Sequence, residues 1–288
     1  MSEYQAGIFD RHYTHHLFLE YALGAGHHDD AVRRALRDVL AETRAETPVL
    51  VAFGPALWRR LDGTFSFPLF SLAGKVPATQ GDLLIWVQAE TPGALFDTGL
   101  MLQRGLRDAL ALQLEVQGFV YHDLRDLTGF VDGIGNPQGD LAEQAALIPA
   151  GQPGAGGSWV LTQKWVHKLE RFHALPVAEQ EKVFGRTKAD AIEFDDQRMP
   201  ANAHVGRTDV ERDGIPQKIW RRSVPYGTPS QHGLYFLAFS GERERFDYLL
   251  QRMYGLTDDG IRDRMLDFTT AVTGAWWYAP TSAWLDAL

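Results

Sequence analysis

A repeated alternation of strand-like and helix-like segments constrains the fold of this chain more than any other feature of its sequence. In the first half, the spacing of apolar residues predicts helices over 30–46 and 92–115, and strands over 49–57, 82–89 and 117–123. In the second half it predicts strands over 159–167 and 232–240, and helices over 168–185, with an interruption at Pro176, and 243–254. Between the halves, the glycine and proline content of residues 138–158 is typical of a linker.

The two halves together predict an α+β protein. Strands that alternate with helices bury a face of their sheet under those helices, and a duplication would explain the similar rhythm of both halves. The chain has 288 residues, which is enough for about two domains. We therefore expect an N-terminal half over 1–145 and a C-terminal half over 146–288, with a core large enough to enclose a cofactor.

Composition excludes several classes of function. The net charge of −9 argues against binding to nucleic acid, which requires a basic surface, and gives no attraction to anionic membranes. Because the chain contains 0 cysteines, it cannot form disulfides, thiolate-bound zinc or iron–sulfur clusters. No apolar run approaches the ~18 residues that a membrane span needs, and no secretory signal is visible at the N-terminus. We therefore expect a cytoplasmic protein.

The densest local signal is the segment GFVDGIGNP at 129–137, in which three glycines and a proline surround Asp132. Glycine lets a backbone approach a flat or anionic ligand closely and adopt a positive φ. The alternative is an ordinary tight turn in which Asp132 caps its own backbone. A P-loop is excluded, because the segment contains no lysine.

Three further segments carry side chains that suit a binding site. In HVGRTD, the spacing lets His204 bind a metal while Arg207 binds a carboxylate at the same site; the alternative for this histidine is an ordinary hydrogen bond. In IWRRSVPYG, two arginines lie among apolar residues, so each is either paired within the fold or directed at an anion. In LDFTTAVTGAWWYAP, Asp267 is either a helix cap or the partner of a buried base.

In combination and in this order, these segments resemble the dye-decolourising peroxidases, a family of haem peroxidases. The matching segments are GFVDG with the following NP at 129–137, HVGR at 204–207, RRSVPYG at 221–227, and DFT with VTG at 267–274. The N-terminal run YQAGIFDRHYTHHLFLEY is similar to the first strand of that family, so the resemblance spans nearly the whole chain. It is to the compact bacterial branch, called type B or P.

The resemblance implies two ferredoxin-like halves, each an antiparallel sheet with helices, as in the dimeric α+β barrel superfamily. One haem b per chain would lie mainly against the C-terminal half and face the glycine-rich loop of the N-terminal half. His204 would be the proximal ligand of its iron. We expect Asp267 to accept a hydrogen bond from the other ring nitrogen, which makes a histidine ligand more basic.

On the other face of the haem, the resemblance implies a set of catalytic residues. Asp132 would carry a proton between the two oxygens of peroxide, and Arg221 would stabilise the charge that develops on the leaving oxygen. Ser223 would orient a water molecule. The remaining haem contacts that the resemblance implies are Arg207, on a propionate, and Ile134, Gly135 and Asn136, along the haem edge.

The implied function is a haem peroxidase that reduces hydrogen peroxide to water through a ferryl intermediate and oxidises a small dye- or phenol-like donor. A homo-oligomer is expected, since this is common in the family. One alternative is a haem-storage or iron-release protein with little peroxidase activity. A chlorite dismutase-like enzyme would share the fold but lack the acid found at Asp132. A ferredoxin-like dimerisation module without cofactor is the third alternative.

Overall fold

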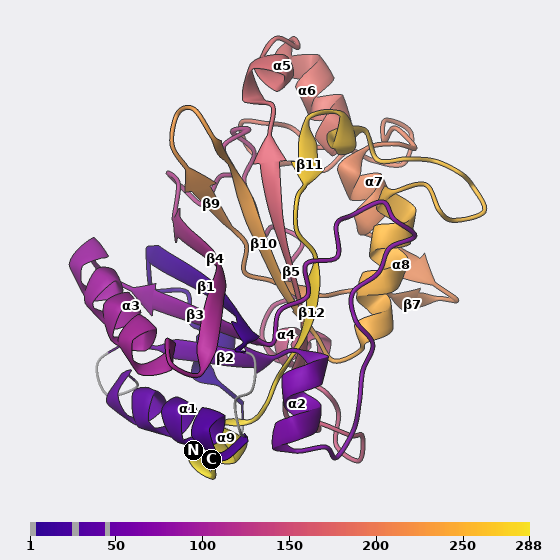
Figure 1. Cartoon of the computed structure of the whole chain (residues 1–288). Helices are drawn as coiled ribbons and strands as arrows, with labels where there is room; N and C mark the ends of the chain where they lie inside the picture. The colour runs from indigo at the N-terminus through magenta and orange to yellow at the C-terminus, as the bar shows by residue number, and fades with distance from the viewer. Residues whose placement is uncertain (1–3, 25–28, 44–46) are drawn as a thin grey trace.

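The computed structural model describes residues 4–24, 29–43 and 47–288, and its first half contains an antiparallel sheet with two helices on it (Figure 1). The strands are β1 (His15–Leu23), β2 (Val49–Phe53), β3 (Leu83–Ala89) and β4 (Leu110–Phe119). They lie in the order β4-β1-β3-β2. Because α1 (Asp29–Thr43) precedes β2 and α3 (Pro92–Leu106) precedes β4, this half has the βαββαβ order of a ferredoxin-like fold.

The second half repeats this arrangement. Its main strands are β5 (Ser158–His167), β9 (Val224–Gly227), β10 (His232–Ser240) and β12 (Ala275–Ala279), in the order β12-β5-β10-β9. Helix α8 (Arg243–Met253) follows β10 as α3 follows β3. The place of α1 is taken by a longer insertion that contains α5 (Leu169–His173), α6 (Val177–Phe184) and α7 (His204–Thr208).

The two sheets close into one barrel. Strand β12 pairs with β2 through Tyr278 and Phe53, and β4 pairs with β9 through Gly118 and Tyr226. Among the described residues the ring therefore runs β5-β12-β2-β3-β1-β4-β9-β10 and returns to β5. The prediction of an α+β fold with two ferredoxin-like halves is confirmed.

The remaining elements are short and lie around this barrel. They are η1 (Ala6–Ile8), α2 (Pro55–Leu61), α4 (Asp140–Ala146), β6 (Glu211–Arg212), β7 (Ile215–Pro216), β8 (Trp220–Arg221), η2 (Arg264–Asp267), β11 (Thr269–Ala271) and α9 (Ser282–Asp286). Of these, β8 pairs with β10 through Arg221 and Ala238, and this pairing fixes the backbone of Arg221 beside β10.

Alternation along the strands separates two layers of core. On β1, Phe18 faces the barrel interior, where it belongs to a cluster with Trp86 and Trp277, whereas Leu17 and Leu19 face the helices. Both faces of β1, β2 and β3 are buried in this way over most of their length, whereas β4 is largely exposed on one face. Helices α1 and α3 cover the outer face of the first half (Figure 1). On the second half, α8 packs over β5 and β10.

Several boundaries differ from those predicted. The strand predicted over 117–123 is the end of β4, which stops at Phe119, and residues 44–46 of the helix predicted over 30–46 lie outside the described residues. The helix predicted over 92–115 ends at Leu106, because the residues from Leu110 onward pair with β1 as strand β4. The strand predicted over 49–57 ends at Phe53; Gly54 lies so close to the backbone of Gly81 that a Cβ would be 2.1 Å from its carbonyl oxygen, and α2 follows at once. The predicted linker contains α4. The predicted break at Pro176 is confirmed, since it separates α5 from α6.

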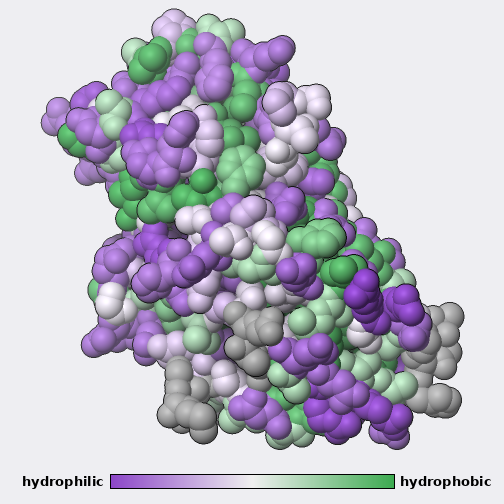
Figure 2. Space-filling model, turned by 90° about the vertical axis from the view of Figure 1, so that its left-hand side faces the viewer, coloured by the Kyte–Doolittle hydropathy of each residue, from purple (hydrophilic) through white to green (hydrophobic). Residues whose placement is uncertain are grey.

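Hydrophilic side chains dominate the face shown in Figure 2, with smaller hydrophobic patches between them. One exposed apolar side chain is Phe96 on α3, which is 64% exposed. Within the described residues, every helix is too short or too polar to cross a lipid bilayer.

Candidate active site

A large cavity lies on the outer face of the second sheet, under α7 and α8. It holds about 1360 Å³ of empty space, part of which is open to solvent. Alternate residues of β5 form its floor, because side chains two apart in a strand share a face. The apolar lining includes Leu161, Trp165, Leu234, Phe236, Phe246, Leu249, Leu250, Met253 and Met265. Concave, largely apolar walls of this kind are typical of cofactor sites.

His204 lines this cavity from the start of α7, and its ring is held from behind by Asp263. Its Nδ1 lies 2.7 Å from Oδ2 of Asp263, whose side chain is fully buried. The other oxygen of Asp263 accepts a hydrogen bond of 2.8 Å from the backbone N–H of Met265. With Nδ1 donating to this carboxylate, Nε2 carries the lone pair, and none of the described residues is hydrogen-bonded to it. That lone pair is available to a metal.

Asp267 does not have the role predicted for it. Its Oδ1 lies 2.7 Å from the guanidinium of Arg262, and both side chains are partly exposed. It occupies the last position of η2, whereas Asp263 caps the start of that short helix. The prediction of Asp267 is therefore wrong: Asp263, four positions earlier, is the acid that contacts His204.

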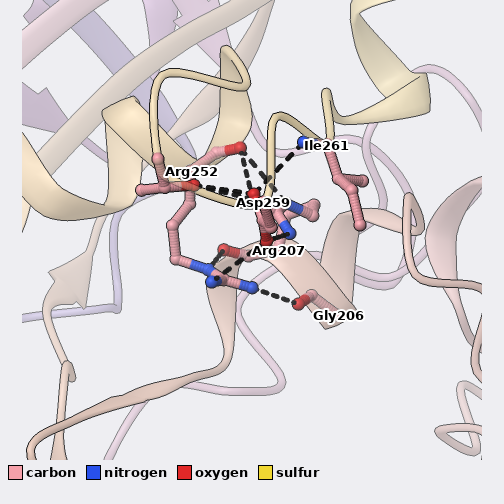
Figure 3. Close-up of polar contacts among 6 residues, drawn as sticks. Gly206, Arg207, Arg252, Asp259 and Ile261 are labelled. Carbon is pink, nitrogen blue, oxygen red and sulfur yellow. Dashed lines mark hydrogen bonds and ion pairs between the residues drawn. The ribbon is translucent and has the colours of Figure 1, made fainter.

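Arg207 also differs from its prediction as a propionate ligand. Its side chain is buried and forms a forked ion pair with Asp259, with N–O distances of 2.7 and 3.1 Å (Figure 3). Its Nε and Nη2 also donate to the backbone carbonyl of Arg252 at the end of α8. The donors of Arg207 are thus committed away from the cavity, which it does not line.

Asp132, Arg221 and Ser223 line the same cavity as His204. Oδ1 of Asp132 accepts a hydrogen bond of 2.7 Å from the N–H of Gly133, and Oγ of Ser223 accepts one from the N–H of Leu237 at 3.3 Å. The structure therefore brings together residues that lie up to 91 positions apart, from Asp132 to Ser223.

The residues next to Asp132 serve Arg221. Oδ1 of Asn136 accepts a hydrogen bond from the backbone N–H of Arg221 and its Nδ2 donates to the carbonyl of Arg221, at 3.0 and 2.8 Å. A Cβ at Gly135 would lie 3.2 Å from the guanidinium, so glycine leaves room for it. Gly135 lines the large cavity as predicted, but Asn136 and Ile134 do not: Asn136 is a backbone clamp and Ile134 is 39% exposed.

Arg186 is a cavity residue that sequence analysis missed. Its buried Nε, like that of Arg221, has no hydrogen-bond partner among the described residues. Burial lowers the pKa of Arg186, while the charge of Asp132 raises it. Two arginines on one cavity wall whose buried Nε donors are unpaired indicate a site for an anionic group. The only sequence signal was an arginine in the insertion before α7.

A second polar pair on the wall was also missed. Nε2 of His167 lies 2.9 Å from Asp126, and its Nδ1 lies 2.8 Å from Oγ1 of Thr269. Although burial raises the pKa of Asp126, the charge and hydrogen bond of His167, with bonds from Thr128, lower it to about 2. Because both ring nitrogens of His167 are engaged, His167 does not offer a free ligand to a metal as His204 does.

A smaller cavity, with about 590 Å³ of empty space, meets the large one at Asp132, Arg221 and Ser223, which line both. Its lining also includes Arg11, Tyr13 and Tyr121 near the surface. The buried side chains of His16 and Arg222 line it as well. The three shared residues thus form a partition between two spaces.

Comparison with known proteins gives consistent matches over the whole chain. Residues 5–120 match the family model described as Dyp-type peroxidase, N-terminal, and residues 123–284 match Dyp-type peroxidase, C-terminal. A dye-decolorizing peroxidase of Mycobacterium tuberculosis is 39% identical over 249 residues, which cover 83% of this chain and 74% of that protein.

Solved structures give the same result. A dyp-type peroxidase protein from Shewanella oneidensis superposes with a TM-score of 0.91 at 28% identity, covering 100% of this chain and 99% of that one. A variant of DypB from Rhodococcus jostii RHA1 in complex with heme superposes with a TM-score of 0.90 at 31% identity, covering 99% of this chain and 98% of that one.

Proposed function

The chain belongs to the Dyp-type peroxidase family, and from this premise we propose which of its residues carry out the reaction. It is a haem-dependent peroxidase that reduces hydrogen peroxide while it oxidises an organic electron donor. The observation that supports our assignment of roles is that one cavity is lined both by His204, with an available Nε2, and by Asp132 and Arg221.

The residues of the large cavity fit a haem. Its walls are apolar, which suits a porphyrin, and the unpaired buried donors of Arg186 and Arg221 suit anionic groups such as propionates or a reduced oxygen. With 0 cysteines in the chain, the haem cannot be attached through thioethers, which agrees with the proposed haem b. We propose that Arg186, rather than Arg207, pairs with a propionate.

We propose that Nε2 of His204 would hold the iron of a bound haem, and that the haem would supply the redox chemistry by which peroxide is reduced. Asp263 keeps the ring in one orientation and one tautomer, because its second oxygen is tied to the backbone of Met265. A buried carboxylate on Nδ1 also increases the electron density that the ring offers from Nε2.

We propose that Asp132 and Arg221, which line the same cavity as His204, have separate roles in the reduction of peroxide. Asp132 accepts the proton of one peroxide oxygen and returns it to the other, which leaves as water. Arg221 stabilises the negative charge on that leaving oxygen, and it can do so without reorganising because Asn136 fixes its backbone on both sides. Ser223, already bonded to β10, orients water between them.

The smaller cavity gives peroxide a route to these residues. It reaches Asp132 and Arg221 from the side opposite to the large cavity and would stay open while a haem fills the latter. The electron donor is proposed to be a small organic molecule of the phenol or dye class. Oligomeric state, cytoplasmic location and the boundary between 1–145 and 146–288 stay predictions.

The direct test of these roles is Arg221→Leu. We expect the variant to bind haem but to react with peroxide at least about 10²-fold more slowly, the effect of losing one preorganised charge. The measurement is the stopped-flow change of the Soret band, and His122→Ala, outside both cavities, is the control. An unchanged rate in Arg221→Leu would remove Arg221 from the mechanism. If the wild type bound haem but did not react with peroxide, the protein would be a haem carrier.

A further inference from the structure

The barrel interior contains a carboxyl group, Glu20, that the proposed mechanism does not use. Glu20 lies on β1 and is 3% exposed. The hydroxyl of Tyr235, on β10 of the other half, donates to Oε1 of Glu20 at 2.6 Å, and the hydroxyl of Thr162 donates to the same oxygen at 3.3 Å. The bond from Tyr235 therefore joins the two sheets across the middle of the barrel.

Within the described residues, every hydrogen-bond partner of this carboxyl group is neutral. Other titratable or charged side chains on the inner face include His16, Lys164, Tyr226 and, beside Trp86, Arg222. None of these four is hydrogen-bonded to Glu20, whose partners are Tyr235 and Thr162. Burial without a cation raises the pKa of Glu20 to about 7, in spite of its two hydrogen bonds. Glu20 can therefore both hold and release a proton near neutral pH.

Tyr235 is placed for electron exchange with the large cavity. Its neighbours along β10, Leu234 and Phe236, line that cavity, while its own ring faces the barrel interior. The phenol and the proposed haem site therefore lie on opposite faces of β10, with the backbone of that strand between them. The phenol is itself fully buried, so bulk solvent cannot take its proton directly.

A line of stacked rings continues from Tyr235 toward the smaller cavity. The ring of Phe18 stacks on Tyr235 with centroids 4.0 Å apart, and that of Trp86 stacks on Phe18 at 5.8 Å. Nε1 of Trp86 lies 3.2 Å from Nδ1 of His16, which lines the smaller cavity. Rings in van der Waals contact give electrons a continuous path.

We propose that Tyr235 and Glu20 form an internal redox pair, in which the phenol supplies an electron to the peroxide-oxidised cofactor and Glu20 takes its proton. This proposal rests on the proposed function, since peroxide is the oxidant. The Oη–H bond of Tyr235 breaks, an O–H bond forms on Oε1 of Glu20, and one electron leaves to the cofactor. The neutral phenoxyl radical is then reduced by the organic donor through the stacked rings, and the proton returns from Glu20.

Tyr226 is the matched control within the same barrel. It is also buried, at 5% exposed against 0% for Tyr235, but its hydroxyl donates to the backbone carbonyl of Trp165 at 3.0 Å. A carbonyl cannot keep a proton at neutral pH, whereas a carboxylate can. Tyr226 should therefore not form a stable neutral radical.

The test is electron paramagnetic resonance of the haem-loaded protein, frozen after mixing with one equivalent of peroxide. We expect a tyrosyl signal that Tyr235→Phe abolishes, that Tyr226→Phe leaves unchanged, and that Glu20→Gln reduces by at least about 10-fold, the scale of a lost proton acceptor. Ring-deuterated tyrosine in the wild-type chain should narrow the signal, which identifies tyrosine without any substitution. An unchanged signal in Tyr235→Phe, or no narrowing, would overturn the proposal.

A second measurement uses the haem-free protein. Infrared spectra should show the carbonyl band of a buried protonated carboxyl group that titrates near pH 7 and is missing from Glu20→Gln. Absence of this band from the wild type would also overturn the proposal. The Soret response separates the two levels of inference: no reaction with peroxide contradicts the proposed function, while a normal reaction without a radical on Tyr235 contradicts the redox pair alone.

Discussion

At the scale of single residues, Asp263 determines how His204 can act. Its two oxygens are bound to Nδ1 of His204 and to the backbone of Met265, so neither the carboxylate nor the ring can rotate freely. A ligand held in this way meets its metal in one orientation and with raised basicity. Asp267, four positions later, is paired with Arg262 and has no such influence.

The first prediction compares these two acids. Asp263→Asn should retain the shape of the contact but lose its charge, so we expect the reaction with peroxide to slow by about 10–100-fold and the reduction potential of the haem to rise. Stopped-flow absorbance and a redox titration measure these effects. Asp267→Asn is the control, and the assignment fails if the two variants behave alike.

The second prediction concerns Glu20 and pH. Its pKa is raised by burial from 4.5 to about 7 in the folded chain. The stability that follows from this shift is fully present below pH 4.5 and is lost as pH rises through 7, by up to about 3 kcal/mol at 1.36 kcal/mol per unit. Glu20→Gln should remove this part of the pH dependence.

Urea unfolding of the haem-free protein between pH 5 and pH 8 measures the effect. Glu42→Gln, at an exposed position on α1, provides the comparison, and its pH dependence should match that of the wild type. Equal pH profiles for the wild type and Glu20→Gln would show that Glu20 does not titrate in this range.

Side-chain partners explain why some site residues could be predicted from sequence and others could not. The glycines around Asp132 and the arginines before Pro225 mark their segments in the sequence itself. Asp263 and Arg186 carry no local mark. Arg186 becomes part of the site because the insertion before α7 folds over the cavity, and Asp263 because the segment that follows α8 passes beside His204. Arg207 was misassigned because the sequence does not show that Asp259 lies beside it.

At the scale of elements, the five-residue helix α7 depends on its neighbours for its position. A helix this short is not stable alone. Arg207 ties it to the end of α8 and to Asp259, and Arg252 of α8 donates in return to the carbonyls of Gly206 and Arg207 (Figure 3). These bonds hold His204, three residues before Arg207, over the cavity.

The third prediction tests this role of Arg207. Arg207→Lys keeps the charge but cannot make the forked bond, so we expect the melting temperature to fall by several degrees and haem to dissociate faster. Thermal unfolding and transfer of haem to an apo-globin measure the two effects. Arg37→Lys, whose ion pair with Asp38 is exposed, should change neither. Normal haem retention in Arg207→Lys would contradict a positioning role.

Element types were predicted better than element ends. Alternation and helical spacing identified β3, β5, β10 and α8 nearly to the residue, because the three strands are mostly buried apolar runs and α8 has one apolar stripe. The end of α3 was missed because leucines at Leu106, Leu110 and Leu112 continue a helical spacing, while pairing with β1 makes the last two part of a strand. Such pairing is a tertiary effect that local pattern does not contain.

At the scale of the whole molecule, the two ferredoxin-like halves share one interior. Strand β12, near the C-terminus, lies between β5 of its own half and β2 of the other. Glu20 and Tyr235 join the two sheets inside the barrel, and Nε1 of Trp220 donates to the carbonyl of Ile8. The duplicated rhythm of the sequence predicted two halves but not that their sheets close on each other.

The fourth prediction follows from this closure. Neither half can bury the inner face of its sheet alone, so we expect the haem-free protein to unfold in a single cooperative transition. Far-ultraviolet circular dichroism and tryptophan fluorescence should give coincident thermal curves. Two separated transitions would show that the halves are independent domains.

A haem titration of the haem-free protein, followed at the Soret band, tests directly whether Nε2 of His204 holds the haem iron. We expect the wild type and His167→Ala to bind one haem per chain with a histidine-ligated spectrum, because both nitrogens of His167 are already engaged. His204→Ala should lose that spectrum and retain haem poorly. A His204→Ala protein with the Soret band and haem affinity of the wild type would contradict the claim that Nε2 of His204 holds the iron.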